Sequence, residues 1–175
     1  MELYLARHGD HRIPDPSYKY KTSLTQQSIN EIDIVAKTIL KSKLESPMIF
    51  SSPLPYCYDS AKIIHNQLRK KYKKNSTTTN ILLTSDHLLP ERNRFEFYKI
   101  LSNLTFRSSV IVVGHEPYLT RMITDIIYLN STNNDLNHTL LRKSGLAKLV
   151  VHSLTPSIIG ELRWLLTPRI LKMIN

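Results

Sequence analysis

The 175-residue sequence predicts an α/β fold, specifically a three-layer α/β/α sandwich with a mostly parallel central sheet. Short apolar runs alternate along the chain with segments whose apolar residues recur every three or four positions, which is typical of alternating strands and helices. The clearest run, residues 110–113, is β-branched throughout, as expected of a strand buried on both faces. The length, with no repeat or linker visible, predicts a single domain over residues 1–175.

The first half of the chain follows the order strand, helix, strand, helix. Apolar runs over residues 3–6 and 48–50 predict the two strands. Helical spacing predicts a helix over residues 28–44, for which Thr25 is a suitable N-cap, and a second helix through positions 61, 64 and 68.

The second half continues the alternation. We predict strands over residues 81–83, 110–113, 146–151 and 161–166, and helices over residues 95–104 and 118–129. Thr167 and Pro168 are suited to the N-cap and first position of a short terminal helix, since proline is favoured at a helix start.

Charge and composition limit the classes of partner. The chain has 24 Lys and Arg against 14 Asp and Glu, a net charge of +10, which suits acidic or phosphorylated protein substrates. The densest basic cluster, residues 69–74, lies at the predicted end of a helix, where cations are favoured by the helix dipole. Its only aromatic residue is Tyr72, so we do not expect a nucleic acid partner.

Cellular location is indicated by what the sequence lacks. The single Cys57 cannot form an internal disulfide, which is typical of a reducing compartment. The first residues lack the basic and long apolar regions of a signal peptide, and no apolar run approaches the length of about 18 residues that a membrane span needs. We therefore expect a cytoplasmic protein without a membrane partner.

Two histidines follow predicted strands. His8 comes directly after the first strand, and His115 follows residues 110–113 after only Gly114. Ligands of open α/β sheets bind at the carboxyl ends of strands, so the two histidines meet there if their strands are neighbours. Arg7 precedes His8, and a guanidinium binds phosphate in a bidentate manner, while an imidazole can act as nucleophile or as hydrogen-bond donor. This set of groups predicts phosphoryl chemistry.

Three segments resemble the motifs of the histidine phosphatase superfamily, in its phosphoglycerate mutase-like branch. They are Leu-Ala-Arg-His-Gly-Asp at 5–10, Ser-Ser-Pro-Leu at 51–54 and Val-Val-Gly-His-Glu-Pro at 112–117. Length, the Arg-His-Gly-Asp start and residues 160–168 are most similar to the small bacterial phosphohistidine phosphatase group called SixA. The resemblance implies a metal-independent reaction without a cofactor, through a phosphohistidine on His8. It further implies that Arg7 binds the phosphoryl oxygens, that His115 stabilises their charge, and that the substrate is a phosphohistidine-bearing protein.

One position departs from the second motif. The resemblance leads us to expect an arginine that completes the phosphate site, but the chain has Tyr56 there. A neutral phenol in its place should weaken phosphate binding by about 1–3 kcal/mol. Three alternatives are open: replacement by an arginine from elsewhere (Arg12, Arg92 or Arg142), a slow enzyme, or a relative that only binds phosphate or phosphoproteins.

Other candidate groups are assigned less directly. Glu91 lies in a stretch, Leu-Pro-Glu-Arg, that resembles the one in which the mutase branch places its proton donor, the alternative being a solvated loop carboxylate. Asp10 is suited either to that role or to a turn. The hydroxyl of Ser144 is a candidate phosphate ligand. Cys57 lacks the arginine six positions later that a cysteine-dependent phosphatase needs, since Ile63 stands there.

Overall fold

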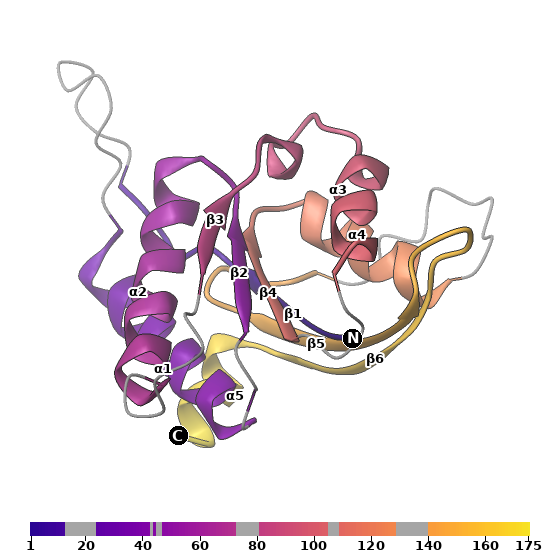
Figure 1. The fold of residues 1–175 in the computed structure, drawn as a ribbon. Coiled ribbons are helices and arrows are strands. Elements are labelled where there is room, and N and C mark those ends of the chain that lie inside the picture. Colours follow the sequence, from indigo (N-terminus) through magenta and orange to yellow (C-terminus); the bar gives the residue numbers. More distant parts are fainter. Residues whose placement is uncertain (13–23, 43, 45–46, 73–80, 105–108, 129–139) are drawn as a thin grey trace, which may run out of the picture.

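A sheet of six strands lies between two layers of helices in the computed structural model, which describes residues 1–12, 24–42, 44, 47–72, 81–104, 109–128 and 140–175 (Figure 1). The strands are β1 (Glu2–Arg7), β2 (Met48–Ser51), β3 (Leu82–Thr84), β4 (Ser109–Gly114), β5 (Leu146–Ser153) and β6 (Ile159–Leu166). The helices are α1 (Gln26–Lys41), α2 (Pro55–Tyr72), α3 (Arg94–Ser102), α4 (Tyr118–Ile127) and α5 (Pro168–Met173), with a short 3-10 turn, η2 (Asp86–Leu88).

The sheet is mostly parallel, as the sequence predicts. The strand order is β3-β2-β4-β1-β5-β6; the pairs among the first four are parallel, and β5 and β6 join antiparallel. The central parallel pair is β1 with β4, in which Arg7 is opposite Gly114. The residues that follow, His8 and His115, therefore leave the sheet side by side at the same edge.

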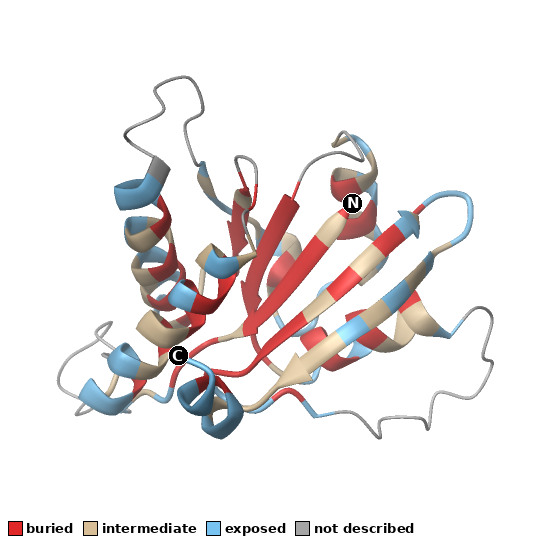
Figure 2. Ribbon diagram, turned by 90° about the horizontal axis from the view of Figure 1, so that it is seen from below, coloured by how far each residue is buried: buried red, intermediate tan, exposed pale blue. Residues whose placement is uncertain are grey.

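Alternation along the central strands separates two apolar cores. Leu3 and Leu5 of β1 face α3 and α4, whereas Tyr4 and Ala6 face α1, α2 and α5. β4 is buried along its whole length, because helices cover both of its faces (Figure 2). Burial of this kind holds the ends of β1 and β4 in fixed positions.

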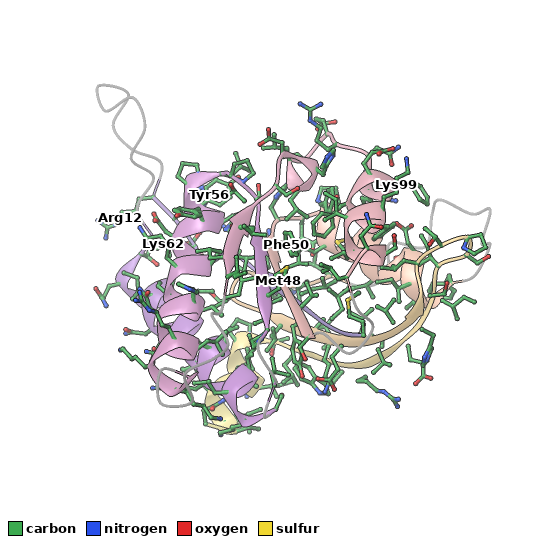
Figure 3. The ribbon with its side chains drawn as sticks, in the orientation of Figure 1. Arg12, Met48, Phe50, Tyr56, Lys62 and Lys99 are labelled. Atoms are coloured by element: carbon green, nitrogen blue, oxygen red, sulfur yellow. The ribbon has the colours of Figure 1, made fainter. Side chains whose placement is uncertain are left out.

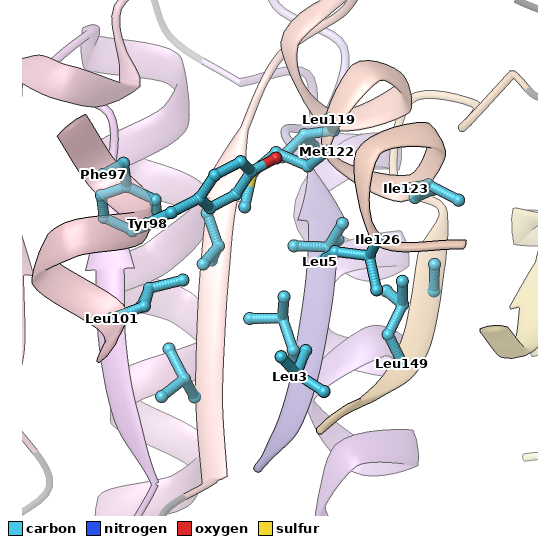
Figure 4. Packing of buried hydrophobic residues seen from close by; sticks show 14 of the residues in the cluster. Leu3, Leu5, Phe97, Tyr98, Leu101, Leu119, Met122, Ile123, Ile126 and Leu149 are labelled. Carbon is cyan, nitrogen blue, oxygen red and sulfur yellow. The ribbon is translucent and has the colours of Figure 1, made fainter. Parts of the chain in front are cut away.

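The core beneath α3 and α4 is built from long aliphatic and aromatic side chains. Figure 4 shows this cluster, with Leu3, Leu5, Phe97, Tyr98, Leu101, Leu119, Met122, Ile123, Ile126 and Leu149 labelled. Complete burial of each large side chain contributes roughly 1.5–3 kcal/mol to folding. The cluster thereby fixes α4, which begins three residues after His115.

Helix boundaries follow the predicted caps. The side chain of Thr25 accepts a hydrogen bond from the Ser28 amide, and that of Thr167 accepts one from Ile170. α1 ends at Lys41, not at residue 44, because the buried Leu44 that extended the apolar pattern lies beyond the helix. α4 ends at Ile127, two residues before the predicted end.

The basic cluster lies where the sequence indicates, at the end of α2. Arg69, Lys70 and Lys71 occupy the last turn of this helix, and positions 73–74 lie outside the described residues. Among the helices of the described ranges, none is long and apolar enough to cross a membrane.

Candidate functional site

The His8 imidazole is held at the end of β1 by its own neighbour. Nδ1 lies 2.7 Å from the carbonyl oxygen of Gly9, and because a carbonyl can only accept, Nδ1 carries the proton and donates it. The other nitrogen, Nε2, therefore presents its lone pair. The His8 main chain is fixed as well, since its amide donates to the carbonyl of Gly114 at 3.0 Å. This is the arrangement that a nucleophilic imidazole requires.

Four buried nitrogen atoms around His8 have no hydrogen-bond partner in the described part of the chain. They are Nε of Arg7, Nδ1 of His11 and both ring nitrogens of His115. An unsatisfied buried donor costs about 1–3 kcal/mol, so such a group in a folded protein calls for an explanation. Donors from two adjacent strand ends suit an oxyanion, which would satisfy them together.

The segment 141–145 closes one side of this group. Nη1 of Arg7 donates to the carbonyl of Leu141 at 2.9 Å, and the Arg7 amide donates to the carbonyl of Gly145 at 3.1 Å. The Glu116 carboxylate accepts from the Leu141 amide at 3.2 Å, and the Ser144 amide donates to the His8 carbonyl at 3.1 Å. The segment is thus tied both to β1 and to the residue after His115.

The start of α2 closes the other side. The Gly9 amide donates to Oγ of Ser60 at 3.1 Å, and the Ser60 hydroxyl donates to the carbonyl of Tyr56 at 2.8 Å. Position 9 requires glycine, because a Cβ there would lie 2.7 Å from Cβ of Ser28 on α1. The residue that orients His8 is therefore packed directly against two helices.

The rings of His8, His11 and Tyr56 lie together. The Tyr56 ring stacks on His11, with centroids 4.1 Å apart and planes 9° apart, and its centroid lies 4.4 Å from that of His8. Burial, followed by the nearby Cys57, raises the pKa of Tyr56 above its ordinary value, so the phenol is neutral near pH 7. The position where the motif leads us to expect a cation thus holds an uncharged aromatic ring (Figure 3).

Burial and positive charge act together on the His8 imidazole. Burial is the main cause that lowers the pKa of His8 to about 4, and Arg7, His11 and Lys143 lower it further against the opposing effect of the Gly9 carbonyl. The pKa of His115 is also lowered, by burial and then by Arg7. Both imidazoles are therefore neutral at pH 7, and Nε2 of His8 carries a free lone pair.

Lys143 is the residue that sequence reasoning missed. It forms an ion pair with Asp10, with Nζ 2.5 Å from Oδ1, and its charge acts on both His8 and His11. The only signal in the sequence is its place beside Ser144, in the turn before β5. Asp10 takes part in this ion pair, and its carbonyl accepts from the Thr25 amide.

The structure brings some predicted residues together and separates others. Arg7, His8, His115 and Tyr56 converge. Glu91 is exposed on the turn after η2, with no hydrogen bond to any other described residue. Ser144 is next to His8 through its amide, and its buried hydroxyl has no hydrogen-bond partner among the described residues. The same hydroxyl lies near Glu31 on α1: burial raises the pKa of that carboxyl, but Gln27, Lys172 and this hydroxyl lower it by more.

The proposed replacement arginines differ in position. The charge of Arg142 acts on Arg7, after the larger effects of burial and Glu116, so Arg142 lies near the site. Arg12 and Arg92 are exposed, and Figure 3 shows Arg12 at the outer edge of the molecule. Cys57 is buried, and burial raises its pKa, so it is a thiol and not a thiolate at neutral pH.

Solved structures with the same architecture superpose on nearly the whole length of this chain. The protein histidine phosphatase SixA, complexed with tungstate, superposes with a TM-score of 0.74 at 19% identity, over 97% of this chain and 98% of that one. The chain has the phosphoglycerate mutase-like fold of the histidine phosphatases. A phosphoserine phosphatase from Entamoeba histolytica, in complex with 3-phosphoglyceric acid, superposes with a TM-score of 0.63 at 15% identity, over 97% and 98% of the two chains.

A mycobacterial glucosyl-3-phosphoglycerate phosphatase shares this histidine phosphatase fold, with a TM-score of 0.63 at 12% identity over 92% of this chain and 96% of that one. Neither a protein-family model nor a curated protein sequence matches the chain. Within the described residues, no group of three or more His, Cys, Asp or Glu side chains is arranged to hold a metal ion.

Proposed function

We propose that the protein is a phosphatase, acting as a single domain, that forms a covalent phosphohistidine intermediate on His8 without a metal ion. The observation that carries this proposal is the 2.7 Å hydrogen bond from Nδ1 of His8 to the Gly9 carbonyl, which leaves Nε2 unprotonated. The unpartnered nitrogens of Arg7 and His115 beside it support the same reading, since the Nε–H of Arg7 and the one N–H of the neutral His115 ring are donors without acceptors.

The reaction has two displacements at phosphorus. In the first, the Nε2 lone pair forms a bond to phosphorus, while the bond from phosphorus to the leaving group breaks and that group takes the electron pair. In the second, water attacks phosphorus, the bond to Nε2 breaks, and inorganic phosphate departs as His8 regains its lone pair. Arg7 and His115 donate to the equatorial oxygens in both steps, where negative charge is concentrated.

Glu91 is our candidate proton donor to the leaving group. An alkoxide needs a proton as it departs, whereas an imidazole released from phosphohistidine is a better leaving group and needs less help. Because Glu91 is exposed on the turn after η2, we expect it to matter more for phosphate monoesters than for phosphohistidine.

The substrate we propose is a phosphohistidine on a protein. The net charge of +10 favours an acidic or phosphorylated protein partner, and the SixA structure with the same fold belongs to a protein histidine phosphatase. A second candidate function, binding of a phosphoprotein without turnover, is favoured by one observation. The ring of Tyr56 stands where a second phosphate-binding cation is expected.

Turnover separates these two functions. We would measure phosphate release from a phosphohistidine-bearing protein without added metal, for the wild type and for His8→Asn, with a sugar phosphate as the comparison substrate. The proposal expects release by the wild type, loss of at least a hundredfold in the variant, and preference for the phosphoprotein. Binding of the phosphoprotein without release by the wild type would support the binding function instead, and preference for the sugar phosphate would overturn the proposed substrate.

A further inference from the structure

Backbone hydrogen bonds made by the residues next to Lys143 hold this position near His8. The next residue, Ser144, donates its amide to the His8 carbonyl at 3.1 Å. The Gly145 carbonyl accepts from the Arg7 amide at 3.1 Å and the Gly145 amide donates to Arg142 at 2.8 Å, which closes a tight turn around position 143. Ser144 has a φ of 56°, a left-handed conformation that directs the chain through this turn. The origin of the Lys143 side chain is therefore fixed relative to His8.

The ammonium group of Lys143 is held by Asp10. Nζ is 2.5 Å from Oδ1 of Asp10, and Asp10 is two residues from His8 in the chain. The positive charge of Lys143, like that of Arg7, lowers the pKa of His8 in addition to the larger effect of burial. Its charge also acts on His11, whose ring stacks on Tyr56.

The ion pair with Asp10 leaves Lys143 available. The two side chains are 44% and 56% exposed, and exposed ion pairs contribute little to stability, typically 0–1 kcal/mol. An ammonium group has three donors, of which Asp10 uses one. Its flexible stem lets the charge move a few ångströms without moving the backbone.

We propose that Lys143 is the second cationic ligand of the phosphoryl group, in the part that an arginine at position 56 would have, and that Asp10 holds it until the phosphoryl group binds. This inference rests on the proposed function and names a residue for the same site. Arg142 is the nearest rival among the predicted replacements, but Lys143 is the cation that an ion pair ties to Asp10, two residues from His8.

The first test is oxyanion binding by the full chain, with tungstate and inorganic phosphate as probes in isothermal titration calorimetry. Loss of one charge-assisted hydrogen bond to a dianion predicts binding weaker by about 10- to 100-fold for Lys143→Met. The matched control is Lys37→Met, which removes an exposed lysine from another ion pair, with Asp33 on α1. The control is expected to stay within about twofold of the wild type.

The second readout separates direct action from a structural role. Removal of the Lys143 charge is expected to raise the pKa of His8, measured by NMR titration of its ring, whose neighbours Arg7, His11 and Tyr56 are unchanged. Tyr56→Arg in the Lys143→Met background is expected to recover most of the lost affinity. Asp10→Asn alone is expected to strengthen binding of the oxyanion probes. The same substitution is expected to have a smaller effect when Lys143 is already replaced by Met.

Failure of this inference and failure of the proposed phosphatase function give different results. If the wild type binds and turns over but Lys143→Met equals the control, Lys143 is not a phosphate ligand and the inference is overturned. A loss seen with His11→Ala and not with Lys143→Met would assign the role to His11. If the wild type binds neither probe and releases no phosphate, the proposed function fails and the inference with it.

Discussion

The centroid of the Tyr56 ring lies 4.4 Å from that of His8, so an uncharged aromatic ring covers the face of the site where a second cation is expected. Tyr56→Arg should therefore increase kcat/KM for a phosphorylated substrate by about tenfold, since a charge-assisted hydrogen bond contributes about 1.5–3 kcal/mol and part of that gain is lost with the stacking on His11. Steady-state kinetics of phosphate release measures the change.

The control for this substitution is Tyr58→Arg, which adds the same charge on the same helix at an exposed position. It should leave kcat/KM within about twofold of the wild type. Equal gains from the two variants would show that added charge on α2, and not completion of the site, is responsible.

Stability should depend on pH through His8. Its pKa is lowered from 6.5 to about 4 in the folded protein, so the unfolded chain binds a proton at a higher pH than the folded one does. Stability from this group is therefore present above pH 6.5 and is lost as the pH falls toward 4, with about 2 kcal/mol lost between pH 7 and pH 5.

Urea unfolding at pH 7 and pH 5 measures this contribution by comparison of the wild type with His8→Gln. Glutamine does not titrate, so the variant should lose about 2 kcal/mol less than the wild type over the same interval. An equal loss in the two proteins would mean that His8 has an ordinary pKa in the folded state.

Gly9 should tolerate no side chain. A Cβ at this position would lie 2.7 Å from Cβ of Ser28, and relief of such overpacking typically costs about 1–3 kcal/mol. Gly9→Ala should also reduce phosphate release, because the Gly9 carbonyl orients His8. Thermal unfolding and activity together test this expectation.

Ser28→Gly supplies the matched compensation, since it removes the atom that the new methyl group meets. The double variant should be more stable than the sum of the two single effects predicts. Strict additivity would place the cause of any destabilisation elsewhere than in this contact.

The helices above the core are joined by a partly buried carboxylate. Asp125 on α4 accepts from Arg94 at 2.8 and 3.2 Å and from the Tyr98 hydroxyl at 2.8 Å, both residues being on α3. Asp125→Ala leaves these donors unpaired and should cost about 2 kcal/mol in the free energy of unfolding. The exposed pair of Asp59 with Lys62 is the comparison, and Asp59→Ala should cost less than about 0.5 kcal/mol. Similar costs for the two variants would contradict this account.

Much of the fold could be predicted because the apolar pattern of the central strands is strong. The run over residues 110–113 reflects burial of β4 on both faces, and the spacing of α1 reflects burial of one face of that helix. Helix ends could not be predicted as closely. Leu44 is buried although it lies beyond the end of α1, so it extended the apolar pattern past the helix. The order of strands could not be read from periodicity alone, so the sequence left open whether the strands before His8 and His115 are neighbours, and the pairing of β1 with β4 shows that they are.

The site was predictable where chemistry is local and not where it depends on tertiary contacts. Arg7, His8 and His115 stand next to strands, so their convergence follows from the sheet. The stacking of His11 on Tyr56 and the approach of Lys143 to Asp10 join segments separated by 45 and 133 residues, and neither has a motif. The burial of Ser144 beside Glu31 likewise depends on how α1 packs.

The central claim, that Nε2 of His8 carries the phosphoryl group, is tested most directly by trapping the intermediate. The wild type would be mixed with a phosphohistidine-bearing protein, quenched in alkali within milliseconds, and analysed by intact mass and peptide mapping. The account predicts an acid-labile phosphoryl adduct on His8 that is absent in His8→Asn. An adduct on another residue, or phosphate release by His8→Asn at the wild-type rate, would contradict it.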